Sequence, residues 1–292
     1  YAPKKPGARN FMNEPETWDL LDRVNDIAGM HGLNLLPEIH DAYDQKIYEK
    51  ISSKGYLGYD FFLPGLMIDA LENKDGSRLV RWAQEQKDKN IRLVTMLGCH
   101  DGIPMLDLKG LVPDVEIQKL IDLIVSRGGH VKNLHGQKNL YYQVNATFYS
   151  ALGEDDRKML LARALHLFMP GKPQVWYLDL FAGKNDEEAV RKGGPGGHKE
   201  INRTNLSMEQ AQAMLQRDVV RNQIDLLRFR NRFPAFSFDA DITADLPADH
   251  QIRLEWNRQG YRAVLHADLS DDSFQIDTEE PGGKKEIIFR QK

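Results

Sequence analysis

Two acidic residues lie where apolar segments of the chain end. Glu38 falls near the end of the apolar segment 33–40, and Asp101 follows the segment 92–97, directly after His100. A carboxylate at the end of a buried strand is costly unless it has a partner or a role. Structural explanations remain open, since Glu38 could pair with a buried arginine and Asp101 could cap a turn beside a hydrogen-bonded core histidine.

If the two carboxylates face one pocket, their chemistry is that of glycosidic bond cleavage. A retaining mechanism uses a nucleophilic carboxylate and a proton-shuttling acid about 5–5.5 Å apart. Further negative charge stabilises the cationic, oxocarbenium-like transition state. Gly98 and Gly102 flank the His100–Asp101 pair, so the backbone there can turn sharply and a ligand can approach it closely.

The segment 139–143 combines aromatic and amide side chains in what we expect to be a loop leading into a helix. Tyr142 could stack on the face of a pyranose ring, and the Gln143 amide could exchange hydrogen bonds with sugar hydroxyls. Ordinary aromatic packing explains the same residues, and this feature alone favours that simpler explanation.

Other kinds of catalytic site find little support. The nine histidines form neither HExxH nor His-x-His, so we expect no metal site. Ser52, Ser53 and Ser150 lack the G-x-S-x-G frame of an elbow nucleophile. The glycine-rich stretch 193–197 follows no strand directly and lacks the Lys-Ser/Thr ending of a phosphate-binding loop.

Composition bounds the class of protein. A chain of 292 residues, 41% hydrophobic and 28% charged, can form one large domain or two smaller ones and is not disordered. A formal net charge of −4 gives no reason to expect nucleic-acid binding. No apolar run approaches the ~18 residues needed to span a bilayer, so we expect no membrane partner. Cys99 is the single cysteine, which excludes an internal disulfide and favours the reducing cytoplasm.

Short apolar strands alternate with amphipathic helices up to Pro234. We expect strands at residues 33–40, 59–62, 92–97 and 174–178. We expect helices from Asn13 or Glu14 with Glu16 completing a capping box, from the second strand through Leu71, at 114–127, at 156–168, and from Ser207, capped by Gln210, to Asn231. Trp18, Leu21, Val24 and Ala28 should form the apolar face of the first helix, and residues 192–199 an exposed loop.

After Pro234 the pattern changes to strict alternation. Ile252, Leu254 and Trp256 alternate with charged residues, which is typical of a half-buried antiparallel strand. Before it, alternating strands and helices imply a parallel sheet, and four strands are half of a (β/α)₈ barrel. An open doubly wound sheet could also use four strands, but no glycine-rich phosphate loop follows any of them. We predict an α/β chain: half a TIM-type barrel over residues 1–234 and a small antiparallel β domain over 235–292.

Several segments, in order and in one register, resemble a known family. Leu-Pro-Glu-Ile-His at 36–40 and Leu-Gly-Cys-His-Asp-Gly-Ile at 97–103 resemble the last two catalytic signatures of glycoside hydrolase family 13, the α-amylase family. The match is closest to its sucrose phosphorylase branch. Further matching segments are residues 1–5, 142–145, 149–153, 182–186 and 200–203.

The resemblance implies roles for the acidic residues and their neighbour. Glu38 matches the general acid/base on the fifth barrel strand. Asp101 matches the carboxylate that stabilises the transition state after the seventh strand, and His100 matches a contact to the glucosyl ring. The chain then corresponds to barrel strands five to eight.

The resemblance also implies substrate contacts farther along the chain. Tyr1 falls at a substrate-binding position, and Tyr142 and Gln143 match the loop that shapes the acceptor and phosphate site. Lys199 stands where phosphorylases of this branch usually carry an arginine that binds the glucosyl unit. A lysine cannot offer the bidentate fork of a guanidinium, so this contact is the weakest of the set.

The family's aspartate nucleophile belongs to an Arg-x-Asp motif on the fourth strand. By this register it would lie about four residues before Tyr1. The first four strands, and the domain usually inserted after the third, have no counterpart in this sequence. We therefore expect either a fragment of a longer polypeptide or a first half supplied by another chain.

The resemblance implies reversible transfer of glucose from an α-glucoside such as sucrose to phosphate, giving α-glucose 1-phosphate. Inorganic phosphate is then a co-substrate, and no metal or organic cofactor is needed. Two alternatives stay open. One is a related transglucosidase or hydrolase with another acceptor, such as water, glycerol, glycerate or a sugar phosphate. The other is a catalytically silent sugar-binding or assembly subunit, because a half-barrel exposes sheet edges and apolar surface that must pair with a partner or self-associate.

Overall fold

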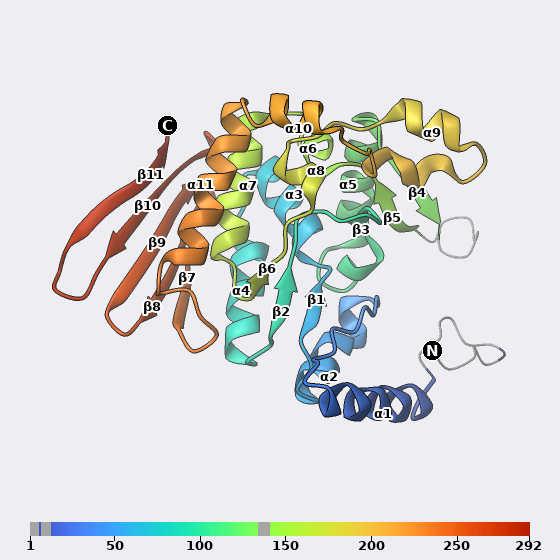
Figure 1. The fold of residues 1–292 in the computed structure, drawn as a ribbon, viewed down its shortest axis with the longest axis horizontal. Coiled ribbons are helices and arrows are strands. Elements are labelled where there is room, and N and C mark those ends of the chain that lie inside the picture. The colour runs from blue at the N-terminus through green and yellow to red at the C-terminus, as the bar shows by residue number, and fades with distance from the viewer. Residues whose placement is uncertain (1–5, 7–12, 134–140) are drawn as a thin grey trace.

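The computed structural model describes residue 6 and residues 13–133 and 141–292 (Figure 1). Tyr1 and Asn139 therefore lie outside the described residues. No helix in the described part of the chain is long and apolar enough to cross a membrane.

A parallel sheet of three short strands forms the centre of the α/β part. Its order is β1 (Gly58–Asp60), β2 (Leu93–Thr95) and β6 (Lys172–Pro173), with Tyr59 opposite Val94 and Thr95 opposite Pro173. The helices that connect and cover these strands are α3 (Leu63–Asn73), α4 (Ser77–Asp88), α5 (Asp114–Ser126), α6 (Phe148–Ala151) and α7 (Asp156–Phe168). The helices expected at 114–127 and 156–168 are confirmed, and the strands expected at 59–62 and 92–97 are present but shorter, at 58–60 and 93–95. The helix α4 was missed, because only the segment through Leu71 was assigned.

Two of the expected barrel strands are wrong in detail. Residues 33–42 run as an extended segment that pairs with no strand among the described residues. Apolar character alone does not make a strand, because a neighbour must accept its backbone hydrogen bonds, and Pro37 cannot donate one. The strand expected at 174–178 is instead β6, two residues earlier, and Tyr177–Leu180 forms helix α8.

The N-terminal helix α1 spans Glu16–Met30. Its predicted capping box is wrong: Pro15 is the N-cap residue and makes no side-chain capping bond, while the Thr17 hydroxyl accepts from the Asn13 N–H at 3.0 Å. Trp18 and Leu21 are buried against α2 (Ile47–Ser53), but Val24 is 44% exposed. Only half of the predicted apolar face is therefore covered.

The segment between β6 and the C-terminal sheet is helical. It contains α9 (Glu187–Gly193), the 3₁₀ turn η4 (Gly197–Asn202), α10 (Met208–Met214) and α11 (Asp218–Arg232). The capping box of Ser207 and Gln210 is confirmed, but the long helix expected to follow it is two helices. The chain breaks at Arg217, whose guanidinium donates to the carbonyl of Ala182 at 2.9 Å and pairs with Asp156. The loop expected at 192–199 is in part the end of α9 and the start of η4.

A small antiparallel sheet lies beside the turn that follows β2. Its order is β3 (Ile103–Pro104), β5 (Tyr141–Asn145) and β4 (His130–Asn133), with Ile103 opposite Val144 and Lys132 opposite Gln143. The described part of the segment 139–143 is therefore a strand, and the expectation of a loop leading into a helix is corrected. Two short 3₁₀ turns complete the α/β part, η1 (Tyr43–Gln45) and η2 (Leu106–Leu108).

The five-stranded antiparallel sheet at the C-terminus is confirmed. Its strands follow in sequence order, β7 (Asp241–Ala248), β8 (Gln251–Arg258), β9 (Tyr261–Asp268), β10 (Ser273–Glu279) and β11 (Lys285–Gln291). Figure 1 shows α7 and α11 between this sheet and the rest of the molecule. Trp256 is buried there, and its indole N–H donates to the Phe168 carbonyl at 2.8 Å. The division at residue 234 stays a prediction, because one hydrophobic core runs through both parts.

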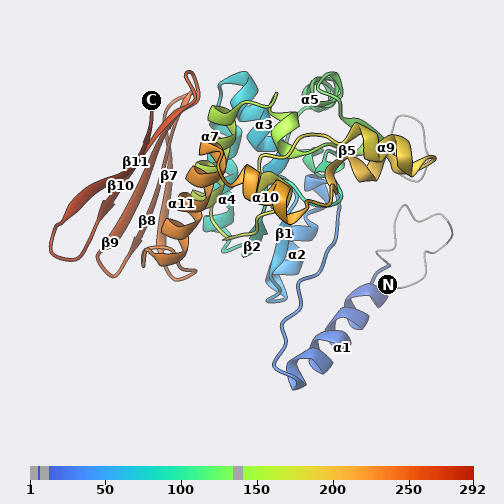
Figure 2. The same cartoon turned by 45° about the horizontal axis from the view of Figure 1, so that its top comes forward.

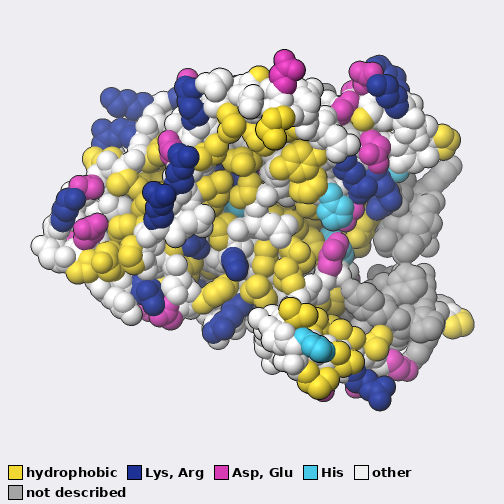
Figure 3. Space-filling model, viewed as in Figure 1, with side chains coloured by type: hydrophobic (Ala, Val, Ile, Leu, Met, Phe, Trp, Pro, Cys, Tyr) yellow, Lys and Arg dark blue, Asp and Glu magenta, His cyan; other side chains and the backbone are white. Residues whose placement is uncertain are grey.

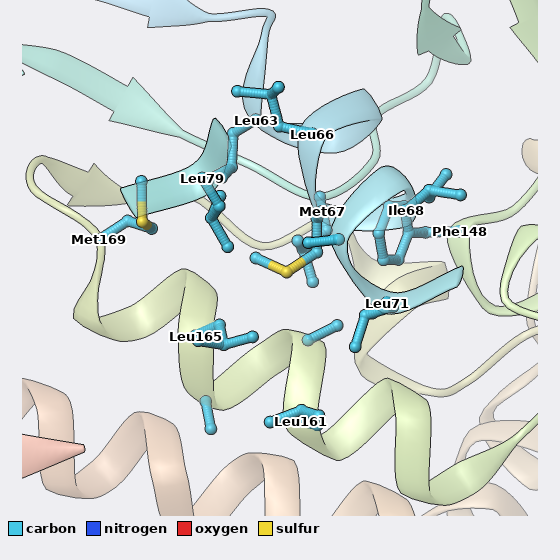
Figure 4. Packing of buried hydrophobic residues seen from close by; sticks show 14 of the residues in the cluster. Leu63, Leu66, Met67, Ile68, Leu71, Leu79, Phe148, Leu161, Leu165 and Met169 are labelled. Atoms are coloured by element: carbon cyan, nitrogen blue, oxygen red, sulfur yellow. The ribbon is translucent and has the colours of Figure 1, made fainter. Parts of the chain in front are cut away.

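That main core gathers around α3 and α7. Figure 4 shows its labelled side chains pointing into one space, Leu63, Leu66, Met67, Ile68, Leu71, Leu79, Phe148, Leu161, Leu165 and Met169. A second, much smaller cluster is built from Trp18, Leu21, Ile51 and Tyr56. The helix α1 therefore belongs to a minor core, and Figure 2 shows it standing away from the body of the molecule.

Candidate active site

Glu38 lies on the extended segment 33–42 with its side chain 49% exposed, so a ligand can reach it. Its neighbour is His40, whose Nε2 lies 3.9 Å from Glu38 Oε1. The His40 ring stacks on Phe61 with centroids 3.6 Å apart, and its Nδ1 lies 3.3 Å from Asp107 Oδ2. Asp107 is buried, which raises the pKa of its carboxyl, while the His40 contact opposes that shift. Phe61 and Asp107 thus hold the His40 ring beside Glu38.

Asp101 lies in the turn that follows β2. Its backbone carbonyl accepts hydrogen bonds from the side-chain amides of Gln143 and Asn145, both buried on β5. Its backbone N–H donates to the Cys99 sulfur at 3.3 Å. Gly102 has φ +125°, and a Cβ there would lie 2.8 Å from the Val144 carbonyl, so only glycine fits. The turn is therefore fastened to β5.

Arg203 holds the same turn from the opposite side. Its Nε donates to the His100 carbonyl at 2.8 Å, and its guanidinium lies 3.4 Å from Asp101 Oδ1. His100 itself is half exposed, with Nε2 3.5 Å from Asp101 Oδ2 and its ring 6.1 Å from that of Trp176. Sequence reasoning assigned no role to Arg203. The matching segment 200–203 pointed to this stretch without saying which of its side chains would reach Asp101.

Adjacent residues of β5 reach the surroundings of both candidate carboxylates. Tyr142 meets the ring of His40, the neighbour of Glu38, edge-on at 5.3 Å. Gln143, the next residue, donates to the Asp101 carbonyl. Burial raises the pKa of Tyr142 most, and the negative charges of Asp107, Asp101 and Glu38 raise it further. The fold thus connects Glu38 and Asp101 through β5, although 62 residues separate them in the sequence (residues 39 to 100).

The chain is similar to known proteins along nearly its whole length. No family model matches it. It is 49% identical to the sucrose 6(F)-phosphate phosphorylase of Ilumatobacter coccineus over 99% of the chain and 56% of that protein, and 37% identical to the sucrose phosphorylase of Streptococcus mutans over 94% and 57%. The crystal structure of sucrose 6F-phosphate phosphorylase from Thermoanaerobacter thermosaccharolyticum superposes with a TM-score of 0.90 and 35% identity, covering 98% of this chain and 57% of that one.

The chain belongs to the sucrose phosphorylase branch of glycoside hydrolase family 13. It spans about half the length of the curated relatives that it matches and corresponds to their C-terminal half. An α-amylase from H. orenii, 14% identical with a TM-score of 0.58, shares the fold. A glucosylglycerol phosphorylase from Marinobacter adhaerens is 34% identical over 94% of the chain and 57% of that protein.

Gln143 and Lys199, two further positions expected from this family, have different surroundings. Gln143 is buried, and its amide is used on the Asp101 carbonyl and on Asn145, so it positions the turn; its contact with substrate stays a prediction. Lys199 lies on η4 and lowers the pKa of Lys132 through its positive charge, which places it beside the Asp101 region. Its proposed contact with the glucosyl unit also stays a prediction.

Lys132 is a site residue that sequence reasoning missed. Its Nζ lies 5.1 Å from the centroid of the Tyr142 ring. Lys132 lies opposite Gln143 on the neighbouring strand, which would have indicated its place in the site. That pairing is known only from the fold. Among the described residues, no group of three or more histidine, cysteine, aspartate or glutamate side chains is placed to hold a metal ion.

A buried carboxylate lies against the start of the turn that carries Asp101. Asp179 on α8 is 1% exposed, and a Cβ at Gly98 would lie 2.8 Å from its Oδ2. Burial raises the pKa of Asp179 to about 6, and the charge of the buried Arg163 opposes the rise. Glycine at 98 thus allows the turn to pass directly over Asp179.

Proposed function

We propose that this chain forms the C-terminal part of an α-glucoside phosphorylase. The enzyme transfers glucose from sucrose, or a close relative of sucrose, to inorganic phosphate with retention of configuration, giving α-glucose 1-phosphate. The observation that carries the proposal is that adjacent residues of β5 reach the surroundings of both carboxylates. Tyr142 meets His40 beside Glu38, and Gln143 donates to the Asp101 carbonyl. The high identity to sucrose phosphorylases along nearly the whole chain supports it.

In the proposed first step, the Glu38 carboxyl protonates the glycosidic oxygen as the bond from that oxygen to C1 breaks. C1 bonds to a carboxylate from residues outside this chain, as the family resemblance implies. In the second step a phosphate oxygen attacks C1, its proton passes to the Glu38 carboxylate, and the bond to the nucleophile breaks. Asp101 stays ionised and stabilises the positive charge that develops on the sugar.

The proposed reaction uses inorganic phosphate as co-substrate and needs no metal or organic cofactor. A second candidate donor is the phosphate ester of sucrose, because the 49% identical relative is a sucrose 6(F)-phosphate phosphorylase. Transfer to other acceptors, including water, is a further alternative, and product analysis for glucose 1-phosphate against free glucose separates it. A reducing cytoplasmic location is proposed from the single Cys99.

We also infer that the barrel is completed by residues outside this chain, on the same polypeptide or on another. The segment 33–42 has no strand beside it among the described residues. The outer face of α1 exposes Val24 at 44%, Ile27 at 56% and Met30 at 75%. Figure 3 shows hydrophobic side chains gathered over this part of the molecule. An apolar helix stripe of this size is typical of a surface that another element covers.

The test of the proposed function is Glu38→Gln in the natural full-length protein, with any chain that completes the barrel. Glutamine keeps the size of the side chain but cannot carry the proton, so kcat should fall about 10²–10⁴-fold. The control is Glu188→Gln, an exposed position on α9, which should leave kcat unchanged. Turnover of sucrose within threefold of wild type in the Glu38 variant would refute the assignment.

A further inference from the structure

Three cationic side chains gather beside Asp101. They are Lys132 on β4, Lys199 on η4 and Arg203 just after η4, and we call them the cationic cluster. Arg203 reaches Asp101 at 3.4 Å, and the Lys132 ammonium lies over the Tyr142 ring at 5.1 Å. The pKa of Lys132 is lowered by burial and then by the charges of Lys199 and Arg203, with Asp101 opposing. Like charges are therefore close enough to repel one another.

The cluster is not neutralised by the described part of the chain. Neither Lys132 nor Lys199 has a carboxylate within 4 Å among the described residues, and Arg203 has only Asp101. Two partly buried lysines elsewhere are paired: Lys158 lies 2.8 Å from Glu72, and Lys74 lies 2.8 Å from Asp272. Three cations that share a single carboxylate repel one another, which costs free energy unless an anion binds between them.

Nearby, a buried nitrogen lacks a partner. The Nε2 atom of His198 is inaccessible and makes no hydrogen bond within the described residues. Its pKa is lowered by burial and by the charges of Lys132, Lys199 and His130, so the neutral ring is favoured. A neutral imidazole nitrogen can donate to an anion or accept from the hydroxyl of a phosphate monoanion.

We propose that the cationic cluster binds the phosphoryl group of a reactant, with Lys132 as the residue that determines specificity for it. This inference rests on the proposed function, since it places the phosphoryl group beside the glucosyl unit held by Asp101. A glucosyl group is neutral and gains little from three cations, whereas a phosphate dianion forms charge-assisted hydrogen bonds with all of them. The phosphoryl group has two sources, inorganic phosphate and a phosphate ester on the sugar that leaves.

The kinetic test compares Lys132→Met, Lys132→Arg and the control Lys184→Met in the natural full-length protein, with any chain that completes the barrel. Methionine keeps the packing on Tyr142 and removes the charge. One lost charge-assisted bond should raise KM for the phosphate-bearing reactant roughly 10–100-fold. The ratio of phosphorolysis to hydrolysis should fall by the same factor, arginine should restore most of the loss, and the exposed, ion-paired Lys184 should show no effect.

The reactant that responds identifies the source. A raised KM for inorganic phosphate assigns the cluster to the co-substrate, and a raised KM for sucrose 6-phosphate, at unchanged KM for phosphate, assigns it to the leaving sugar. Equal loss of phosphorolysis and hydrolysis would overturn the proposal, because Lys132 would then only hold Tyr142 in place.

A binding measurement keeps this proposal separate from the proposed function. Acylation of lysine amines, read by mass spectrometry, is followed with and without inorganic phosphate or fructose 6-phosphate. One of these anions should slow acylation of Lys132 at least fivefold and leave Lys184 unchanged. This result stands even if the wild-type protein catalyses no phosphorolysis, in which case only the proposed function fails. Absence of protection by both anions would overturn the cluster as a phosphoryl site.

Discussion

The two ends of the described chain differ in how completely they bury their apolar side chains. At the C-terminal end, β8, β9 and β10 present an unbroken apolar face to α7, and Trp256 is 1% exposed. At the N-terminal end, α1 buries Trp18 and Leu21 but leaves a stripe of large hydrophobic side chains in solvent. Each strand of the C-terminal sheet pairs with the strands next to it in the sequence. In the described part of the chain, the segment 33–42 pairs with no strand and this stripe on α1 stays exposed.

The difference shows which part of the fold this chain specifies by itself. The C-terminal sheet and the helices α3, α4, α7 and α11 share one core, so they should unfold together. The helix α1 contributes to a separate cluster of four buried residues and should open independently. The C-terminal end of the described chain should therefore be the more stable of the two.

The largest expected effect tests this asymmetry with two tryptophans. Trp256→Ala removes a buried side chain at the junction of sheet and barrel and should lower the free energy of unfolding by about 3–5 kcal/mol. Trp18→Ala should leave the main transition nearly unchanged and reduce hydrogen-exchange protection in α1 and α2 only. Chemical denaturation and native-state hydrogen exchange measure the two quantities. A similar loss of global stability in both variants would show that the two clusters unfold as one.

Sequence reasoning succeeded where local pattern decides the structure. Alternation along β8 predicted a strand with one buried face, and the apolar spacing of α7 gave its bounds to the residue, Asp156–Phe168. It failed where distant neighbours decide. Residues 33–40 are as apolar as β2, yet only β2 has strands on both sides. The break between α10 and α11 is set by the Arg217 contact with Ala182, which no local pattern reveals.

The candidate site divides in the same way. Glu38 and Asp101 were predicted because each follows an apolar segment and because both match family signatures. Their connection through Tyr142 and Gln143 on β5 needed the fold. Arg203 and Lys132 were missed, since surface cations are common in sequence and become informative only when three of them gather around one carboxylate. Gln143 was predicted as a substrate contact, and this stays a prediction; its bond to the Asp101 carbonyl became visible only in the fold.

The next effect concerns a carboxylate inside the shared core. Asp179 has a pKa raised to about 6 by burial, against about 3.9 when unfolded. The folded chain therefore keeps a proton that the unfolded chain loses between pH 4 and pH 6, and stability falls as pH rises through this window. Asp179→Asn removes the titration, so the variant should lose about 3 kcal/mol less than wild type between pH 4 and pH 7. Denaturant unfolding across this range measures it.

Two other buried groups titrate in both proteins and cancel in the comparison. Asp60, with its pKa also raised to about 6 by burial, lowers stability as pH rises, whereas His166, with a pKa lowered to about 3, raises it. The control Asp225→Asn, exposed on α11, should leave the pH profile unchanged. Parallel profiles for wild type and Asp179→Asn would show that Asp179 is hydrated in solution and does not belong to the dry core.

The smallest effect on folding, and the one that most directly probes the incomplete end, comes from the outer face of α1. Val24→Ser with Ile27→Ser changes side chains that are 44% and 56% exposed, so the unfolding free energy of the isolated chain should change by no more than about 0.5 kcal/mol per site. Self-association, measured by sedimentation velocity, should nevertheless decrease.

The matched control is Val115→Ser with Val125→Ser on α5, similarly exposed but outside the stripe, and it should leave association unchanged. In the protein with a completed barrel the α1 pair should instead reduce stability, because the same face is then buried. Equal association of wild type and both double variants would mean that α1 faces solvent in the functional protein and that the barrel is completed elsewhere.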